Sequence, residues 1–219
     1  RWIEYFTVRD PERFRRFLER GEQFRGMITA VLREQGVPTE VYYLAMIESG
    51  FTTHARSHAK AVGIWQFMKG TAKRYGLRVD EYVDERRDPM RATAAAALYL
   101  KDLHNVFQNW YLAMAAYNAG EGRIVSAIMR AKTRDFWEIA RLRALPQETM
   151  QYIPKFLAAT TIGHNLRKYG IEEITPQARP AVSPVAVPSP IRLNDIAKAT
   201  GVDADPVSYT HLTLPTILL

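Results

Sequence analysis

Apolar residues recur at helical spacing along the first part of the chain. Asp10 and Pro11 form a common helix-start signal, because aspartate accepts hydrogen bonds from free N–H groups and proline fits the first helical position. An apolar stripe with helical spacing follows and runs to Gly36; its members are Phe14, Phe17, Leu18, Met27, Ile28, Val31 and Leu32. The pattern predicts a long helix that begins at Pro11 and ends before Gly36.

The same start signal recurs at Asp88 and Pro89, ahead of a long alanine-rich segment. Small side chains let neighbouring helices approach closely, so we expect this helix at the centre of a bundle. Further helical patterns cover residues 110–117, 122–129 and 148–169, and no convincing strand alternation occurs before residue 170. The sequence therefore predicts an all-α, or nearly all-α, domain over residues 1–170.

The amino-acid composition of the chain changes after this domain. Prolines at 176, 180, 184, 188 and 190 favour extended backbone, so residues 171–190 are predicted to form a linker. Residues 191–207 contain one short helical pattern that starts at Asn194 and stops at Gly201. Residues 208–219 match no element, and we expect them to be a tail foreign to the native protein.

One charged residue interrupts an apolar stripe. Val41, Leu44 and Ala45 recur at helical spacing, and the next position on that face is Glu48. Either the helix ends here and Glu48 turns toward water, or a carboxylic acid is held in a partly apolar cleft.

Composition indicates which partners the protein favours and which kinds of site it lacks. With 30 Lys and Arg against 23 Asp and Glu, the net charge is +7, which favours anionic partners such as nucleic acid, phospholipid or an acidic polymer. The absence of cysteine excludes disulfides and thiolate metal sites, and no apolar run approaches the roughly 18 residues that span a bilayer. The chain starts at Arg1 with no apolar signal region behind it, so we expect any targeting segment to have been lost.

Four short motifs carry a resemblance to a known family. They are Glu48-Ser49, Gly63-Ile64-Trp65-Gln66-Phe67, Ala116-Tyr117-Asn118-Ala119-Gly120 and Tyr152. In this order and over roughly residues 1–170, the chain resembles the catalytic domain of the soluble-lytic-transglycosylase family of peptidoglycan-cleaving enzymes. The combination of motifs is specific to that family, whereas one motif alone is weak.

The resemblance implies a goose-lysozyme-like helical fold with a cleft for glycan strands. It implies that Glu48 is the sole catalytic acid and base and that Ser49 orients or polarises the substrate. Gln66 would bind sugar, and Tyr117, Asn118 and Tyr152 would line the cleft. It further implies peptidoglycan as partner, no cofactor, a monomer in the bacterial periplasm or cell envelope, and outer-membrane association through a segment ahead of Arg1.

The physical character of Glu48 fits this role. A carboxylate at a helix C-terminus faces the negative end of the helix dipole, and apolar neighbours such as Ile47 and Phe51 reduce its hydration. Both effects favour the protonated form, which is the form that donates a proton to a glycosidic oxygen.

The segment after Glu48 is basic and contains no Asp or Glu before Asp80. Most glycoside hydrolases use two carboxyl groups about 5 to 9.5 Å apart, so the gap argues against that mechanism, although a distant residue such as Glu121 could supply the second group. The family's mechanism needs one carboxyl group, since the substrate's N-acetyl carbonyl and C6 hydroxyl do the rest. The alternatives are a hydrolytic muramidase on the same fold and a non-catalytic glycan-binding relative.

Several of these residues also have purely structural interpretations. Trp65 and Phe67 could be core aromatics. The segment from Tyr117 to Gly120 could be a helix end with a glycine cap, and Tyr152 could pack beside a kink at Pro154.

Two other kinds of ligand are not expected. His54 and His58 have the spacing of a zinc pair but no third ligand in view, so we expect no metal. The cations are dispersed and form no recognisable nucleic-acid motif, so we expect no nucleic-acid partner. Residues 185–202 resemble the opening of a LysM-type glycan-binding module, of which only a first-helix length is present.

Overall fold

The computed structural model describes residues 1–171, 174–175, 195, 198–199 and 201. Its α-helices are α1 (Trp2–Glu4), α2 (Pro11–Glu34), α3 (Tyr42–Ser49), α4 (Lys69–Arg74), α5 (Pro89–Phe107), α6 (Trp110–Ala119), α7 (Glu121–Ala131), α8 (Phe136–Arg141) and α9 (Gln147–His164). Four shorter turns join them: the π-helix η1 (Tyr5–Arg9) and the 3₁₀ helices η2 (Thr39–Val41), η3 (Glu85–Arg87) and η4 (Leu166–Tyr169). The described part contains isolated β-bridges and no strand, which confirms the predicted all-α class.

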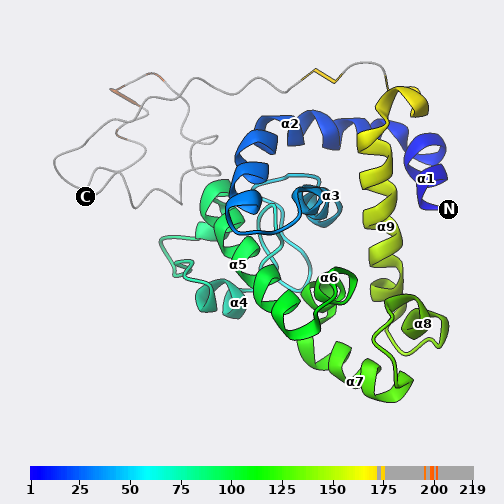
Figure 1. Cartoon of the computed structure of the whole chain (residues 1–219). Coiled ribbons are helices and arrows are strands. Elements are labelled where there is room, and N and C mark those ends of the chain that lie inside the picture. Colours follow the sequence, from blue (N-terminus) through cyan, green and yellow to red (C-terminus); the bar gives the residue numbers. More distant parts are fainter. Residues whose placement is uncertain (172–173, 176–194, 196–197, 200, 202–219) are drawn as a thin grey trace.

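Helix α5 forms the middle of the bundle, as predicted. Asp88 caps it by accepting hydrogen bonds from the backbone N–H groups of Met90 and Arg91, at 2.9 and 3.0 Å. Its inward face carries buried alanines, and α2 and α6 both pack against it. In Figure 1, α3 and α6 lie between α5 and α9. The small side chains allow this close approach.

Helix α3 is short and almost entirely buried, from Tyr42 to Ile47. It ends at Gly50, which has left-handed backbone angles (φ +58°, ψ +37°). A Cβ atom at Gly50 would lie 2.3 Å from the ring of Phe17 on α2, so glycine is required both by conformation and by space. Helix α3 packs against both α2 and α9.

The structure corrects the sequence analysis in two places. The helix predicted over 148–169 is two elements, because Asn165 leaves helical geometry (φ −135°) and separates α9 from η4. Pro154 lies inside α9 without ending it. The six-residue helices α4 and α8 were missed, since a single turn or two gives too few positions for a periodic signal.

The predictions for the C-terminal part lie largely outside the described residues. This holds for the linker (171–190), the LysM-like fragment (191–207) and the tail (208–219). Ile171 and Ile174, assigned to the linker, pack against the core of the helical domain. Within the described residues, no helix is long and apolar enough to cross a membrane.

Candidate active site

A cavity of about 750 Å³ opens between the N-terminal segment, α2 and the C-terminal end of α3. The loop that follows α3 forms another part of its lining, and α9 contributes Lys155. Three of the predicted site residues line it, namely Glu48, Ser49 and Gln66. A concave site with a few convergent polar groups is typical of ligand binding.

Glu48 is half-buried on the last turn of α3. Burial raises the pKa of its carboxyl to about 7, because the charged form loses hydration. A hydrogen bond from Tyr152 and the positive charge of Lys155 act in the opposite direction, and the effect of burial is larger. The raised pKa expected from the sequence is thus confirmed, and at neutral pH a large share of Glu48 carries a proton.

Tyr152 and Lys155 reach this carboxyl from neighbouring turns of α9. The buried hydroxyl of Tyr152 donates a hydrogen bond to Oε1 of Glu48. Lys155 Nζ donates to the carbonyl of Ile47 at 3.1 Å and so satisfies one of the free carbonyls at the end of α3. Sequence reasoning missed Lys155, although its position three residues after Tyr152 on a predicted helix puts both on one face.

Ser49 ties α3 to the loop that carries Gln66. Its hydroxyl donates to the carbonyl of Ile64 at 2.9 Å, with a longer contact of 3.4 Å to the carbonyl of Ala45. The hydroxyl oxygen can still accept a hydrogen bond from a ligand in the cavity that it lines.

Gln66 has left-handed backbone angles (φ +49°), which are unusual for a residue with a side chain. Its Nε2 donates to the carbonyl of Gly63 at 2.8 Å, and the backbone groups of Val62 and Phe67 bond each other at 3.0 and 3.1 Å. The loop is therefore a tight turn that holds the amide of Gln66 against the cavity. Strained residues of this kind occur often at functional sites.

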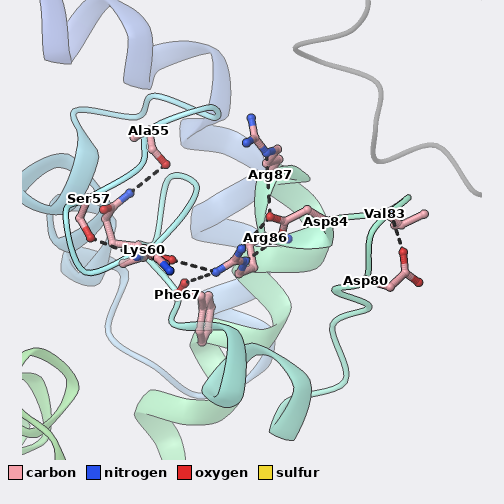
Figure 2. A network of polar contacts seen from close by, with 11 residues as sticks. Ala55, Ser57, Lys60, Phe67, Asp80, Val83, Asp84, Arg86 and Arg87 are labelled. Atoms are coloured by element: carbon pink, nitrogen blue, oxygen red, sulfur yellow. Dashed lines mark hydrogen bonds and ion pairs between the residues drawn. The ribbon is translucent and has the colours of Figure 1, made fainter.

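A buried arginine, Arg86, donates hydrogen bonds to the backbone of this turn, as Figure 2 shows. Arg86 forms an ion pair with Asp84 at 2.7 Å and donates to the carbonyls of Phe67 (3.0 Å) and Lys60 (3.2 Å). A Cβ atom at Gly63 would lie 1.8 Å from the carbonyl oxygen of Arg86. The sequence analysis missed this support, because a run of charges usually indicates a solvated face.

Tyr117 and Asn118, at the end of α6, connect the parts of the site and are not among the residues that line the cavity. The Tyr117 hydroxyl donates to the carbonyl of Trp65 at 2.7 Å, and burial followed by the nearby charge of Glu48 raises its pKa. Asn118 Oδ1 accepts a hydrogen bond from Thr149 at 3.0 Å. Their contact with a glycan stays a prediction.

The motif aromatics Trp65 and Phe67 are core residues, which supports their structural interpretation. Trp65 is fully buried and donates from Nε1 to the hydroxyl of Thr93 at 2.9 Å. Phe67 is also buried and packs edge-on against Tyr117. These two rings fix the turn around Gln66 from the core side.

The other acidic and metal candidates lie apart from Glu48 or are already engaged. Glu121 pairs with Arg74 at 4.0 Å and does not line the cavity. Asp10 does line it, but serves as the N-cap of α2 by accepting from the backbone N–H of Arg13. His54 and His58 are exposed, and the described residues contain no group of three or more metal-ligating side chains.

Comparisons with known proteins place the chain in a family. The family model for the transglycosylase SLT domain matches residues 27–140. Membrane-bound lytic murein transglycosylase D of Escherichia coli (strain K12) is 37% identical over 188 residues, which cover 84% of this chain and 41% of the relative. Peptidoglycan transglycosylase gp16 of Escherichia phage T7 is 36% identical over 141 residues, which cover 62% of this chain and 10% of the relative.

A solved structure shares the fold. The X-ray structure of an inactive variant of lytic transglycosylase Slt from Pseudomonas aeruginosa superposes with a TM-score of 0.56 and 26% identity, over 70% of this chain and 25% of that one. The chain thus spans less than half the length of these relatives. The matched family segment covers just over half of the 219 residues and contains Glu48, Ser49, Gln66, Tyr117 and Asn118. On this evidence the chain belongs to the transglycosylase SLT domain family.

Proposed function

We propose that this protein is a peptidoglycan lytic transglycosylase. It would cleave the β-1,4 bond between N-acetylmuramic acid and N-acetylglucosamine without water and leave a 1,6-anhydromuramoyl end. The observation that carries the proposal is a half-buried Glu48 with a pKa of about 7 beside a cavity, in a chain whose relatives are named lytic murein or peptidoglycan transglycosylases. Since one relative is named membrane-bound, we expect the protein in the bacterial cell envelope.

In the first step, protonated Glu48 donates its proton to the glycosidic oxygen as the C1–O4 bond breaks. A carboxyl with a pKa near the working pH is efficient in this role, because a large fraction holds the proton and releases it readily. The departing N-acetylglucosamine leaves with a 4-hydroxyl group. Positive charge develops at C1 of the muramoyl residue and needs a partner.

Among the described residues that line the cavity, no second carboxylate is free to stabilise that charge. Of the two acids among the described lining residues, Asp10 is engaged as a helix cap and paired with Arg13 at 3.9 Å. The substrate's own N-acetyl oxygen can stabilise C1 instead. This favours a one-carboxylate mechanism over the two-carboxylate hydrolases.

In the second step, ionised Glu48 takes the proton of the muramoyl C6 hydroxyl as O6 bonds to C1. Glu48 regains its proton, and no water is consumed. The nucleophile is tethered to the reacting sugar, and such intramolecular attack reaches effective molarities on the order of 10⁵–10⁸ M. The Tyr152 hydroxyl would stabilise Glu48 during its ionised phase.

Digestion of purified sacculi in ¹⁸O-water tests the reaction class. We expect new muramoyl ends that are one water lighter than hydrolytic ends, carry no label and resist borohydride reduction. Labelled, reducible muramoyl ends would instead indicate a hydrolytic muramidase. Absence of any cleavage would favour a non-catalytic glycan-binding protein.

Glu48→Gln tests the assignment of the acid. The amide keeps the shape of the side chain but has no transferable proton, so activity should fall by at least about 10²–10⁴-fold. Glu40→Gln in η2, the same change outside the cavity, should leave activity unchanged. Activity of Glu48→Gln within a few-fold of the parent would refute the assignment.

The fold of Glu48→Gln can be checked by its stability. In the parent, the carboxyl binds more protons when folded (pKa about 7) than when unfolded (ordinary pKa 4.5), so the free energy of unfolding falls as pH rises through this window. Gln does not ionise, so the variant does not lose stability in this way. The variant should therefore match the parent at pH 4 and exceed it by up to about 3 kcal/mol at pH 8.

A further inference from the structure

The cavity that contains Glu48 is strongly cationic. The described residues that line it include two acids, Asp10 and Glu48, against six bases: Arg1, Arg9, Arg13, Arg20, Arg56 and Lys155. A concave wall with one sign of charge attracts ligands of the opposite sign, because the low-dielectric walls concentrate the field. The unmodified sugars of a glycan strand are neutral and give no reason for this charge.

Two of these arginines enclose one aromatic ring. The guanidinium carbons of Arg13 and Arg20 lie 5.4 and 5.2 Å from the ring centroid of Phe17. Arg20 is half-buried and donates to the hydroxyl of Thr52. Its pKa is lowered by burial and by the neighbouring Arg16 and Arg13. The charges are therefore held close together by packing, against their mutual repulsion.

The acids in the cavity compensate little of this charge. Asp10 lies 3.9 Å from Arg13, at the edge of an ion-pair contact, and Arg9 pairs with Glu4 at 3.1 Å. Among the residues that the structure describes, Arg20 and Arg56 form no ion pair within 4.0 Å. Arg20 is partly buried and Arg56 is exposed, and cations without carboxylate partners at a concave surface favour binding of an anion.

These cations lie next to the candidate acid. Phe17 packs on Gly50, two residues after Glu48, and Thr52, which accepts from Arg20, is two residues further on. Arg56 lines the same cavity from the following loop. A ligand that places a glycosidic bond at Glu48 thus presents its substituents to the arginines. In a peptidoglycan strand, the anionic substituents are carboxylates attached through the lactyl group at C3 of muramic acid.

We propose that Arg13, Arg20 and Arg56 form a carboxylate subsite that selects glycan strands by the anionic groups on muramic acid. The inference rests on the proposed function and adds a substrate class to it. The carboxylates come either from the stem peptide or, where the peptide has been removed, from the lactyl group itself. Planar guanidinium groups suit both, because they bind carboxylates through two parallel hydrogen bonds.

The test compares three soluble substrates with one glycan backbone. They are uncrosslinked peptide-bearing strands, the same strands with all carboxylates converted to methylamides, and strands stripped of peptide by an amidase, which retain the lactyl carboxylate. We expect KM for the methylamidated strands to be about three- to tenfold above that for the peptide-bearing strands. Raising the salt from about 0.05 to 0.5 M should narrow this ratio, since ions screen the attraction.

The variant Arg13→Gln/Arg20→Gln/Arg56→Gln should lose most of the ratio by raising KM for the charged strands alone. The stripped strands identify the source, because only they carry a free lactyl carboxylate. A KM near that of the methylamides assigns the stem-peptide carboxylates alone, and a KM near that of the peptide-bearing strands shows that the lactyl carboxylate can take their place. Arg20→Lys keeps the positive charge at this position, so it shows whether an effect of the triple variant comes from the lost charge or from disturbed packing. Arg33→Gln, which removes one arginine from an exposed part of α2 outside the cavity, is the control for loss of a surface charge and should leave the KM ratio unchanged.

An unchanged KM ratio in the triple variant, with normal 1,6-anhydro products, would overturn the subsite and leave the proposed function intact. Equal KM values in the parent for all three substrates would have the same meaning. Arginine-dependent binding of DNA or anionic vesicles, without any effect on the KM ratio, would assign the cationic wall to another partner. A parent protein that forms no 1,6-anhydro product would instead count against the proposed function.

Discussion

At the scale of single residues, the site depends on the opposing effects that set the pKa of one carboxyl, that of Glu48. Burial at the end of α3 makes ionisation of Glu48 costly, while Tyr152 and Lys155 make it easier. The outcome is a pKa of about 7, which allows the same group to give a proton and take it back. A more exposed Glu48 would be ionised at neutral pH and would be a poor acid.

This balance predicts a pH profile. Because the first step needs protonated Glu48, kcat/KM should be level below about pH 6 and fall tenfold per pH unit above about pH 7. Tyr152→Phe removes a hydrogen bond that stabilises the ionised form, so the pKa of Glu48 should rise and the falling limb should move up by about one pH unit. Rates measured from pH 5 to 9 decide the matter.

The control for this profile is Tyr82→Phe, which removes a hydroxyl from an exposed tyrosine and should leave the limb in place. A falling limb that stays unmoved in Tyr152→Phe would mean that the hydrogen bond does not set the pKa of Glu48. A falling limb that moves to lower pH in Tyr152→Phe would mean that the hydrogen bond raises the pKa of Glu48 instead of lowering it.

At the scale of elements, η3 supports the loop that presents Gln66. Its Arg86 is buried, pairs with the partly buried Asp84 and donates to two carbonyls of the loop. The loop backbone approaches η3 so closely that Gly63 has no room for a side chain. A buried ion pair of this kind contributes geometry more than net stability. Loss of one partner, however, leaves a buried charge unpaired.

Asp84→Ala should therefore destabilise the domain by about 3–5 kcal/mol, because Arg86 would keep its charge and lose its carboxylate. For a domain of this size that corresponds to roughly 10 °C in Tm. Calorimetry of the variant measures the effect, and a rise in KM should accompany it, since the turn around Gln66 loosens.

Arg78→Gln breaks an exposed pair with Asp80 in the same segment and serves as the comparison. Its Tm should stay close to that of the parent, because water screens exposed pairs. Equal Tm losses in both variants would contradict the special role of the buried pair.

At the scale of the whole molecule, the cavity is built from parts far apart in the chain. The N-terminal segment reaches α9, where Trp2 Nε1 donates to the side chain of Gln151 at 3.0 Å, and α1 lies beside α9 in Figure 1. This segment precedes the matched family region at 27–140 and supplies one wall of the cavity. The wall therefore depends on contacts between the two ends of the helical domain.

The same packing sets the C-terminal limit of the stable unit. Ile171 and Ile174 contact the core and are partly buried, so a protein that ends at Thr175 should keep the Tm of the parent within about 2 °C. A protein that ends at Gly170 loses both side chains, each worth about 1 kcal/mol at partial burial, and should melt several degrees lower. Scanning calorimetry of the two truncations separates these cases, and equal Tm values would show that the isoleucines contribute nothing.

The sequence by itself was enough for the class of fold, and it singled out Glu48 as the candidate acid. Helical periodicity and the Asp-Pro start signals are local, so both ends of α2 and the start of α5 were predicted close to where the structure has them. Glu48 stood out because a charge occupied an apolar stripe. The raised pKa followed from the same local reasoning, since its apolar neighbours are adjacent in sequence.

Only the tertiary structure decided which distant residues share the site. Lys155 lies close to Glu48 although more than a hundred positions separate them, and no sequence pattern pointed to it. Tyr152 was expected there only through the family resemblance, and Arg86 was not singled out at all. Trp65 turned out to be core because burial depends on packing from several helices at once. Periodicity records the face of each helix, whereas the side chains that meet across helices are set by packing angles and loop paths that no local pattern contains.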